Sequence, residues 1–138
     1  MTAKEQPSAR ILVIDDEPRV CIAISRAVEI LGYDVESMTD SKAGIQKAIN
    51  ENYDIVITDV LMPGLNGIEI IKLLRDHCPE TRVIAISGGA MNTDQTGATL
   101  DLVGAYGVSS MLYKPFSTAQ ISAAIKNEMQ NAISWERA

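Results

Sequence analysis

The sequence has only two cysteines, no long apolar run and no basic leader, and each shortage excludes a class of protein. Cys21 and Cys78 lie far apart and form no CxxC motif, which favours ordinary reduced thiols over a disulfide or a metal site. No apolar run approaches the roughly 20 residues that span a bilayer, and no basic-then-apolar segment opens the chain. We therefore expect a cytoplasmic protein without membrane insertion.

Basic residues are also in the minority. The chain has 12 Lys and Arg against 18 Asp and Glu, which gives a formal net charge of −6. Proteins that bind nucleic acid directly usually present a basic face. The charge balance therefore argues against a direct nucleic-acid partner and leaves a protein partner open.

Short β-branched segments alternate with segments of helical period along the 138 residues. Nearly continuous apolar segments are typical of strands that are covered on both faces of a sheet. Five strands are predicted, at residues 11–14, 34–38, 54–58, 82–87 and 109–113. This β-α alternation predicts one domain with a parallel sheet, right-handed crossovers and helices on both faces.

Apolar stripes and end signals predict the helices between these strands. Gly32 should end the first helix, and Ser117 with Gln120 forms a capping box that should start the last one. Residues 88–97 are rich in Gly, Thr and Asn, so the fourth helix should start late, after a mobile loop. The stripes comprise Val20, Ile24, Ala27, Val28 and Leu31; then Ile45, Ala48 and Ile49; then Ile68, Ile71 and Leu74.

Side chains of complementary chemistry stand at four strand ends. Asp15 and Asp16 follow the first strand, Asp59 ends the third, Ser87 ends the fourth and Lys114 follows the fifth. Each has an ordinary explanation by itself, because acids often cap helices or begin turns and a lone Ser or Lys is uninformative. Ligands of open α/β sheets bind beyond the carboxyl ends of the strands. The set as a whole therefore predicts one site.

Several acids in one crevice call for a cation. Two carboxylates about 4 Å apart repel each other by roughly 4 kcal/mol at an effective dielectric constant of about 20. Oxygen ligands with open positions suit Mg²⁺, which also binds phosphate oxygens. Beside such a metal Asp59 could form an aspartyl phosphate, with Lys114 supplying positive charge and Ser87 donating to a phosphoryl oxygen.

Four motifs occur in a fixed order: VIDDEP (13–18), DVLMPGLNG (59–67), ISGG (86–89) and LYKPF (112–116). Together they resemble the receiver domain of two-component response regulators, of the stand-alone type. The resemblance implies a flavodoxin-like α/β fold, doubly wound, with a five-stranded parallel sheet in the order 2-1-3-4-5 and five helices. It implies a single domain over residues 1–138 with a core at about 10–130. A fragment of a larger regulator would look the same.

The resemblance also implies the roles of the site residues. Asp59 would accept a phosphoryl group from a sensor histidine kinase or a histidine phosphotransfer protein in a reaction that requires Mg²⁺. Asp16 would bind this metal directly, Asp15 mainly through water, and the backbone carbonyl of Leu61 would be a further ligand beside Asp59.

The remaining roles concern the switch. Ser87 would follow the phosphoryl group, and Lys114 would be the family's lysine, joined to Pro115 by a cis bond. Such a domain acts as a phosphorelay switch on a downstream protein, as a monomer or a weak dimer. It is not an enzyme with a separate substrate. Autodephosphorylation should be slow, because Leu61 and Gly89 offer no side chain to orient the attacking water.

Departures from the family pattern keep one alternative open. Met111 occupies the position where receivers commonly have Tyr or Phe, so the aromatic switch is missing or displaced to Tyr113 or Tyr106. A degenerate interaction module that needs no phosphorylation is therefore the alternative function. A haloacid-dehalogenase-type phosphatase would need an acid at position 61, and a flavin binder would not place acids beside the flavin phosphate.

Overall fold

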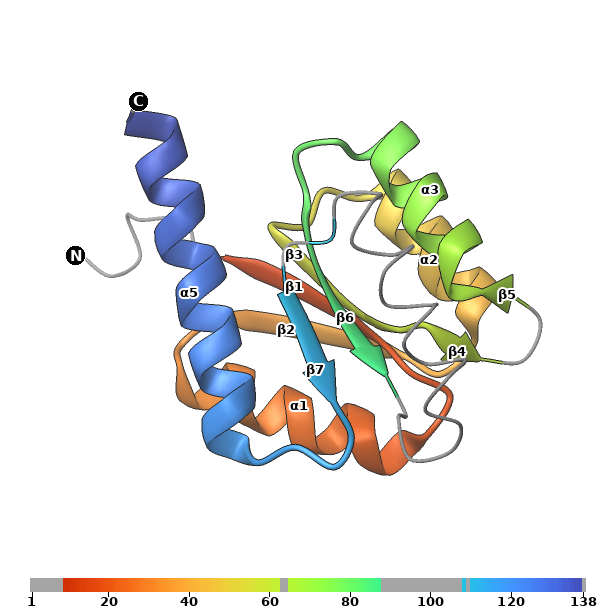
Figure 1. Ribbon diagram of the computed structural model, residues 1–138, viewed down its shortest axis with the longest axis horizontal. Coiled ribbons are helices and arrows are strands. Elements are labelled where there is room, and N and C mark those ends of the chain that lie inside the picture. The colour runs from red at the N-terminus through yellow and green to blue at the C-terminus, as the bar shows by residue number, and fades with distance from the viewer. Residues whose placement is uncertain (1–8, 63–64, 88–107, 109, 138) are drawn as a thin grey trace.

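A five-stranded parallel sheet forms the centre of the molecule (Figure 1). The structure is a computed structural model that describes residues 9–62, 65–87, 108 and 110–137, without the side chains of 61–62, 65–68 and 131–137. The strands are β1 Arg10–Ile14, β2 Asp34–Met38, β3 Ile55–Asp59, β6 Arg82–Ser87 and β7 Ser110–Tyr113. Their order, β2-β1-β3-β6-β7, confirms the predicted arrangement 2-1-3-4-5.

Helices cover both faces of this sheet (Figure 1). Leu12, Val56 and Val83 point to the face covered by α2 (Ser41–Asn50) and α3 (Gly67–His77). The alternate residues of the same strands, such as Ile11 and Ile57, point to the face covered by α1 (Pro18–Ile30) and α5 (Thr118–Arg137). The predicted fourth helix falls in residues 88–107, outside the described residues.

The end signals in the sequence act as expected. Pro18 is the first residue of α1, and Gly32 follows this helix with a φ of 93°, a backbone conformation that favours glycine. At the start of α5, Ser117 N donates to Gln120 Oε1 at 2.8 Å and Gln120 N donates to Ser117 Oγ at 3.1 Å. These reciprocal bonds confirm the predicted capping box.

Two features of the chain were not predicted. After β3 a short antiparallel hairpin is formed by β4 (Leu61–Met62) and β5 (Leu65–Asn66). The last helix continues to Arg137, beyond the core that was predicted to end at about residue 130. Among the helices that the structure describes, none is long and apolar enough to cross a membrane.

Candidate functional site

The carboxyl ends of the central strands bring the predicted site residues together. Asp59 is the last residue of β3 and lies beside Ile86 of β6 in register. Ser87 is the last residue of β6, and its carbonyl oxygen accepts a hydrogen bond of 2.8 Å from the backbone N–H of Lys114. Asp15 directly follows β1, the other neighbour of β3. The fold therefore places four predicted residues at one edge of the sheet.

Lys114 is the charged centre of this pocket. Its Nζ lies 2.9 Å from Asp59 Oδ2, 3.2 Å from Asp15 Oδ2 and 3.2 Å from Glu17 Oε2. The side chains of Asp15 and Asp59 are 0% and 4% exposed, whereas that of Glu17 is 61% exposed. The ammonium group thus joins two buried carboxylates to one that is exposed to solvent.

Burial and charge together set the protonation of the pocket. Burial raises the pKa of Asp15 to about 6, although a hydrogen bond from the backbone N–H of Glu17 opposes this shift. Burial acts to lower the pKa of Lys114, but the hydrogen bond and negative charge of Asp59, with the charge of Asp15, outweigh burial and raise it. Lys114 is therefore a permanent cation in this pocket.

The acidic residues at the start of α1 fit a hard cation. Ligand oxygens of Asp15, Asp16 and Glu17 lie within 4.8 Å of one another. Asp15 Oδ2 is buried and, in the described part of the chain, has the ion-pair contact with Lys114 but no hydrogen-bond partner. A buried carboxylate oxygen without a hydrogen bond is unfavourable. A metal ion that prefers oxygen ligands would relieve this, and its type of donor set matches Mg²⁺.

Ser87, Leu61 and the bond before Pro115 are the remaining positions to which the sequence assigned a role. Ser87 is buried, with 1% of its surface exposed, at the edge of the sheet where Asp59 lies. Leu61 begins β4, two residues after Asp59, and its carbonyl remains a predicted metal ligand. The bond between Lys114 and Pro115 is cis, as predicted.

Glu17 belongs to the acidic end of the first strand, but the sequence assigned it no role in the site. Acids at such positions often cap a helix, yet at the N-cap of α1 the Glu17 side chain makes no capping hydrogen bond. Its carboxylate instead accepts a hydrogen bond from Lys114 at 3.2 Å. The signal in the sequence was a third consecutive acid after β1, more than a helix cap requires.

The position that usually holds the aromatic switch is also described. Met111 is half-buried and packs against the core on the α2 and α3 face. Tyr113, two residues further on β7, is 51% exposed, and Tyr106 lies outside the described residues. The displacement of the switch to either tyrosine stays a prediction.

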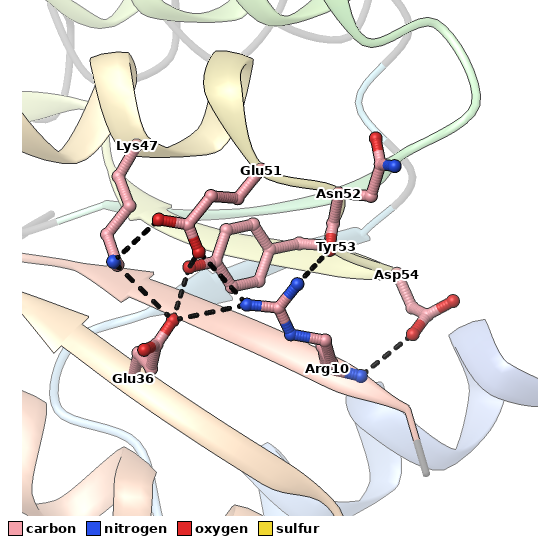
Figure 2. Close-up of polar contacts among 7 residues, drawn as sticks. All are labelled: Arg10, Glu36, Lys47, Glu51, Asn52, Tyr53 and Asp54. Atoms are coloured by element: carbon pink, nitrogen blue, oxygen red, sulfur yellow. Dashed lines mark hydrogen bonds and ion pairs between the residues drawn. The ribbon is translucent and has the colours of Figure 1, made fainter. Parts of the chain in front are cut away.

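A second polar cluster lies at the opposite, amino end of the sheet (Figure 2). Arg10 and Lys47 form ion pairs with Glu36 and Glu51, and the Tyr53 hydroxyl donates to both carboxylates. Charges of opposite sign balance here, and every one of these side chains has partners. This cluster therefore resembles a structural network, unlike the acidic pocket.

The fold and the pocket together define a doubly wound α/β protein with a charged site at its strand ends. The chain matches the response regulator receiver domain over residues 11–126, and it belongs to that family. Response regulator ArlR of Staphylococcus saprophyticus subsp. saprophyticus is 32% identical over 117 residues, which are 85% of this chain and 50% of that protein. The chain thus spans about half the length of this relative.

Solved structures agree with this assignment. The CheY-like response regulator receiver domain protein from Methanospirillum hungatei JF-1 has a TM-score of 0.83 at 21% identity, covering 92% of this chain and 98% of that chain. The beryllofluoride-activated NtrC4 receiver domain dimer has a TM-score of 0.78 at 26% identity, covering 89% and 98%. The first likeness shows the fold alone.

Proposed function

We propose that this receiver domain accepts a phosphoryl group on Asp59 in a Mg²⁺-dependent reaction and so controls a partner protein. The donor would be the phosphohistidine of a sensor histidine kinase or of a histidine phosphotransfer protein, and the reaction would take place in the cytoplasm. The observation that carries the proposal is the ion pair of 2.9 Å between Lys114 Nζ and Asp59 Oδ2, in a pocket that also gathers Asp15, Asp16 and Glu17.

The transfer needs an anionic nucleophile and fixed positive charge. A carboxylate oxygen of Asp59 would attack the phosphorus atom, the bond from phosphorus to the imidazole nitrogen would break, and the leaving imidazole would keep its electron pair and take a proton. Lys114 would neutralise charge on the phosphoryl oxygens. The Ser87 hydroxyl would donate to one of these oxygens. Bound Mg²⁺, held by Asp15, Asp16, Asp59 and the Leu61 carbonyl, would supply further positive charge.

The switch would follow from the new charge. The phosphoryl group carries about −1.5 to −2 charges in place of the single negative charge of the Asp59 carboxylate, and Ser87 would move toward it. The segment that we expect to follow, including Gly88 and Gly89, lies outside the described residues. The domain would change only its own phosphorylation state, with slow autodephosphorylation, rather than act on a separate substrate.

Intact-mass spectrometry tests this proposal directly. Wild type incubated with acetyl phosphate and Mg²⁺ should gain the mass of one phosphoryl group, and the gain should disappear without Mg²⁺ or in Asp59→Asn. Asp76→Asn, at an exposed acid on α3, is the matched control and should react like wild type. If neither acetyl phosphate nor a histidine phosphotransfer protein loads the wild type, the phosphorylation-independent interaction module becomes the better proposal.

A further inference from the structure

Lys114 also contacts Glu17, a residue that is not among the predicted site residues. It donates one hydrogen bond to Asp59 and a second to Glu17, and it forms an ion pair with Asp15. An ammonium group has three donors in all. Any phosphoryl oxygen that needs Lys114 must therefore share this group with carboxylates that already hold it.

The three carboxylates would differ, after phosphorylation, in whether they keep Lys114 as their partner. Asp59 would carry the phosphoryl group and Asp15 would face the metal, so both would exchange Lys114 for another positive partner. Glu17 is not one of the predicted metal ligands, and 61% of its side chain is exposed, so we expect it to keep Lys114 as its partner. Its hydrogen bond to Lys114 would continue to compete with the phosphoryl oxygens.

We propose that Glu17 is a positioning residue for Lys114, which holds the ammonium group by a hydrogen bond of 3.2 Å and thereby weakens the binding of a phosphoryl group at Asp59. The inference rests on the proposed function, since it concerns the same pocket. The Glu17 side chain is available for this contact, because it makes no capping hydrogen bond at the start of α1. Its contact with Lys114 joins residues 97 positions apart.

Beryllofluoride is a suitable probe, because the NtrC4 receiver domain has been solved in its beryllofluoride-activated form. Its affinity would be measured by fluorine NMR at Mg²⁺ concentrations that saturate each variant. Glu17→Ala removes the carboxylate, whereas Glu17→Asp keeps the charge but shortens the side chain so that it no longer reaches Lys114. Glu29→Ala, at an exposed acid on the same helix, is matched for net charge.

Both Glu17 variants should bind beryllofluoride about fivefold more tightly than wild type, the size expected for an exposed ion pair. Glu29→Ala should stay within about twofold of wild type. If Glu17→Asp binds like wild type while Glu17→Ala binds more tightly, general charge repulsion explains the effect and the positioning role is wrong. Unchanged or weaker binding in both variants also overturns it.

The two proposals fail in different ways. If wild type does not bind beryllofluoride, or Asp59→Asn binds it equally well, the proposed phosphoacceptor site is wrong and the inference falls with it. If wild type binds and Asp59→Asn does not, while all Glu17 variants match wild type, the inference alone is overturned.

Discussion

At the residue scale, the buried charge of Asp15 lowers the stability of the metal-free fold. Its side chain is fully buried, and its pKa rises from an ordinary 3.8 to about 6, first because of burial. The folded protein therefore binds a proton here more tightly than the unfolded chain does. Between about pH 4 and pH 6 the stability contributed by this group falls as pH rises, and the whole penalty is present above pH 6.

Asp15→Asn should consequently stabilise the metal-free protein at neutral pH. We expect a gain on the order of 2 kcal/mol in the free energy of unfolding at pH 7.5, because the charge no longer has to be buried. The gain should shrink as pH falls from 6 to 4 and vanish below about pH 3.8, where Asp15 becomes protonated in both states. Urea unfolding of both proteins at several pH values, in EDTA, measures this difference. A gain that does not depend on pH would contradict the argument.

Among the elements, α5 is attached to the sheet through a buried charge. Glu128 has 1% of its side chain exposed and forms an ion pair of 3.0 Å with Arg82 at the start of β6. It also accepts a hydrogen bond from the Ser110 hydroxyl at the start of β7. Ser87 is at the other end of β6, and Lys114 directly follows the other end of β7. The helix α5 and the site are therefore attached to the same two strands.

Loss of this carboxylate should be costly, because it leaves Arg82 and Ser110 without their shared partner. We expect Glu128→Ala to lower the free energy of unfolding by about 3 kcal/mol. Replacement of both charges, Arg82→Met with Glu128→Leu, should recover at least half of that loss, since apolar pairs often substitute for buried ion pairs. Chemical denaturation of the three variants and wild type tests this. Equal losses in the single and double variants would show that packing, not charge, fixes α5.

Gly44 sets how closely α2 approaches the sheet. A Cβ atom at this position would lie 2.9 Å from Cγ1 of Ile14, closer than carbon atoms pack. Gly44→Val should therefore lower the free energy of unfolding by about 2 kcal/mol through overpacking. Ala43→Val, on the exposed side of the same helix, controls for the helix propensity of valine and should cost less than about 1 kcal/mol. Thermal unfolding distinguishes the two variants.

Local patterns predicted most of these elements, while packing in three dimensions decided the rest. The strands at 34–38 and 82–87 have the predicted bounds, because the β-branched run at 82–87 and the residues that flank each strand are local signals. The hairpin of β4 and β5 was missed because its strands have two residues each, too few for a periodic pattern. The Glu17 contact with Lys114 was also missed, since no local signal reports a pairing across 97 positions.

At the scale of the whole molecule, the two ends of the sheet differ in charge balance. At the amino end the ion-paired side chains balance, with Arg10 and Lys47 against Glu36 and Glu51, while the Asp54 carboxylate accepts a hydrogen bond from the backbone N–H of Arg10 (Figure 2). At the carboxyl end one ammonium group, Lys114, faces four carboxylates, Asp15, Asp16, Glu17 and Asp59, which leaves an excess of three negative charges when all are ionised. The fold thus concentrates its unbalanced charge at the proposed site.

This imbalance predicts that Mg²⁺ stabilises the entire fold. A ligand that binds only the native state adds roughly 2.7 kcal/mol at 100 times its dissociation constant, so the melting temperature should rise by several degrees in Mg²⁺. Asp16→Asn, which removes the carboxylate expected to bind the metal directly, should abolish most of the rise. Calorimetric scans with and without Mg²⁺ measure the effect.

Glu36→Gln is the informative control for this last prediction, because it removes one negative charge from the balanced end of the sheet. If the metal responds to overall net charge, both variants should lose part of the stabilisation, since each changes the net charge by one. If the metal responds to the local excess at the carboxyl end, Glu36→Gln should keep the full rise and Asp16→Asn should lose it. Equal responses of the two variants would therefore show that Mg²⁺ acts as a diffuse counterion rather than as a ligand of the pocket.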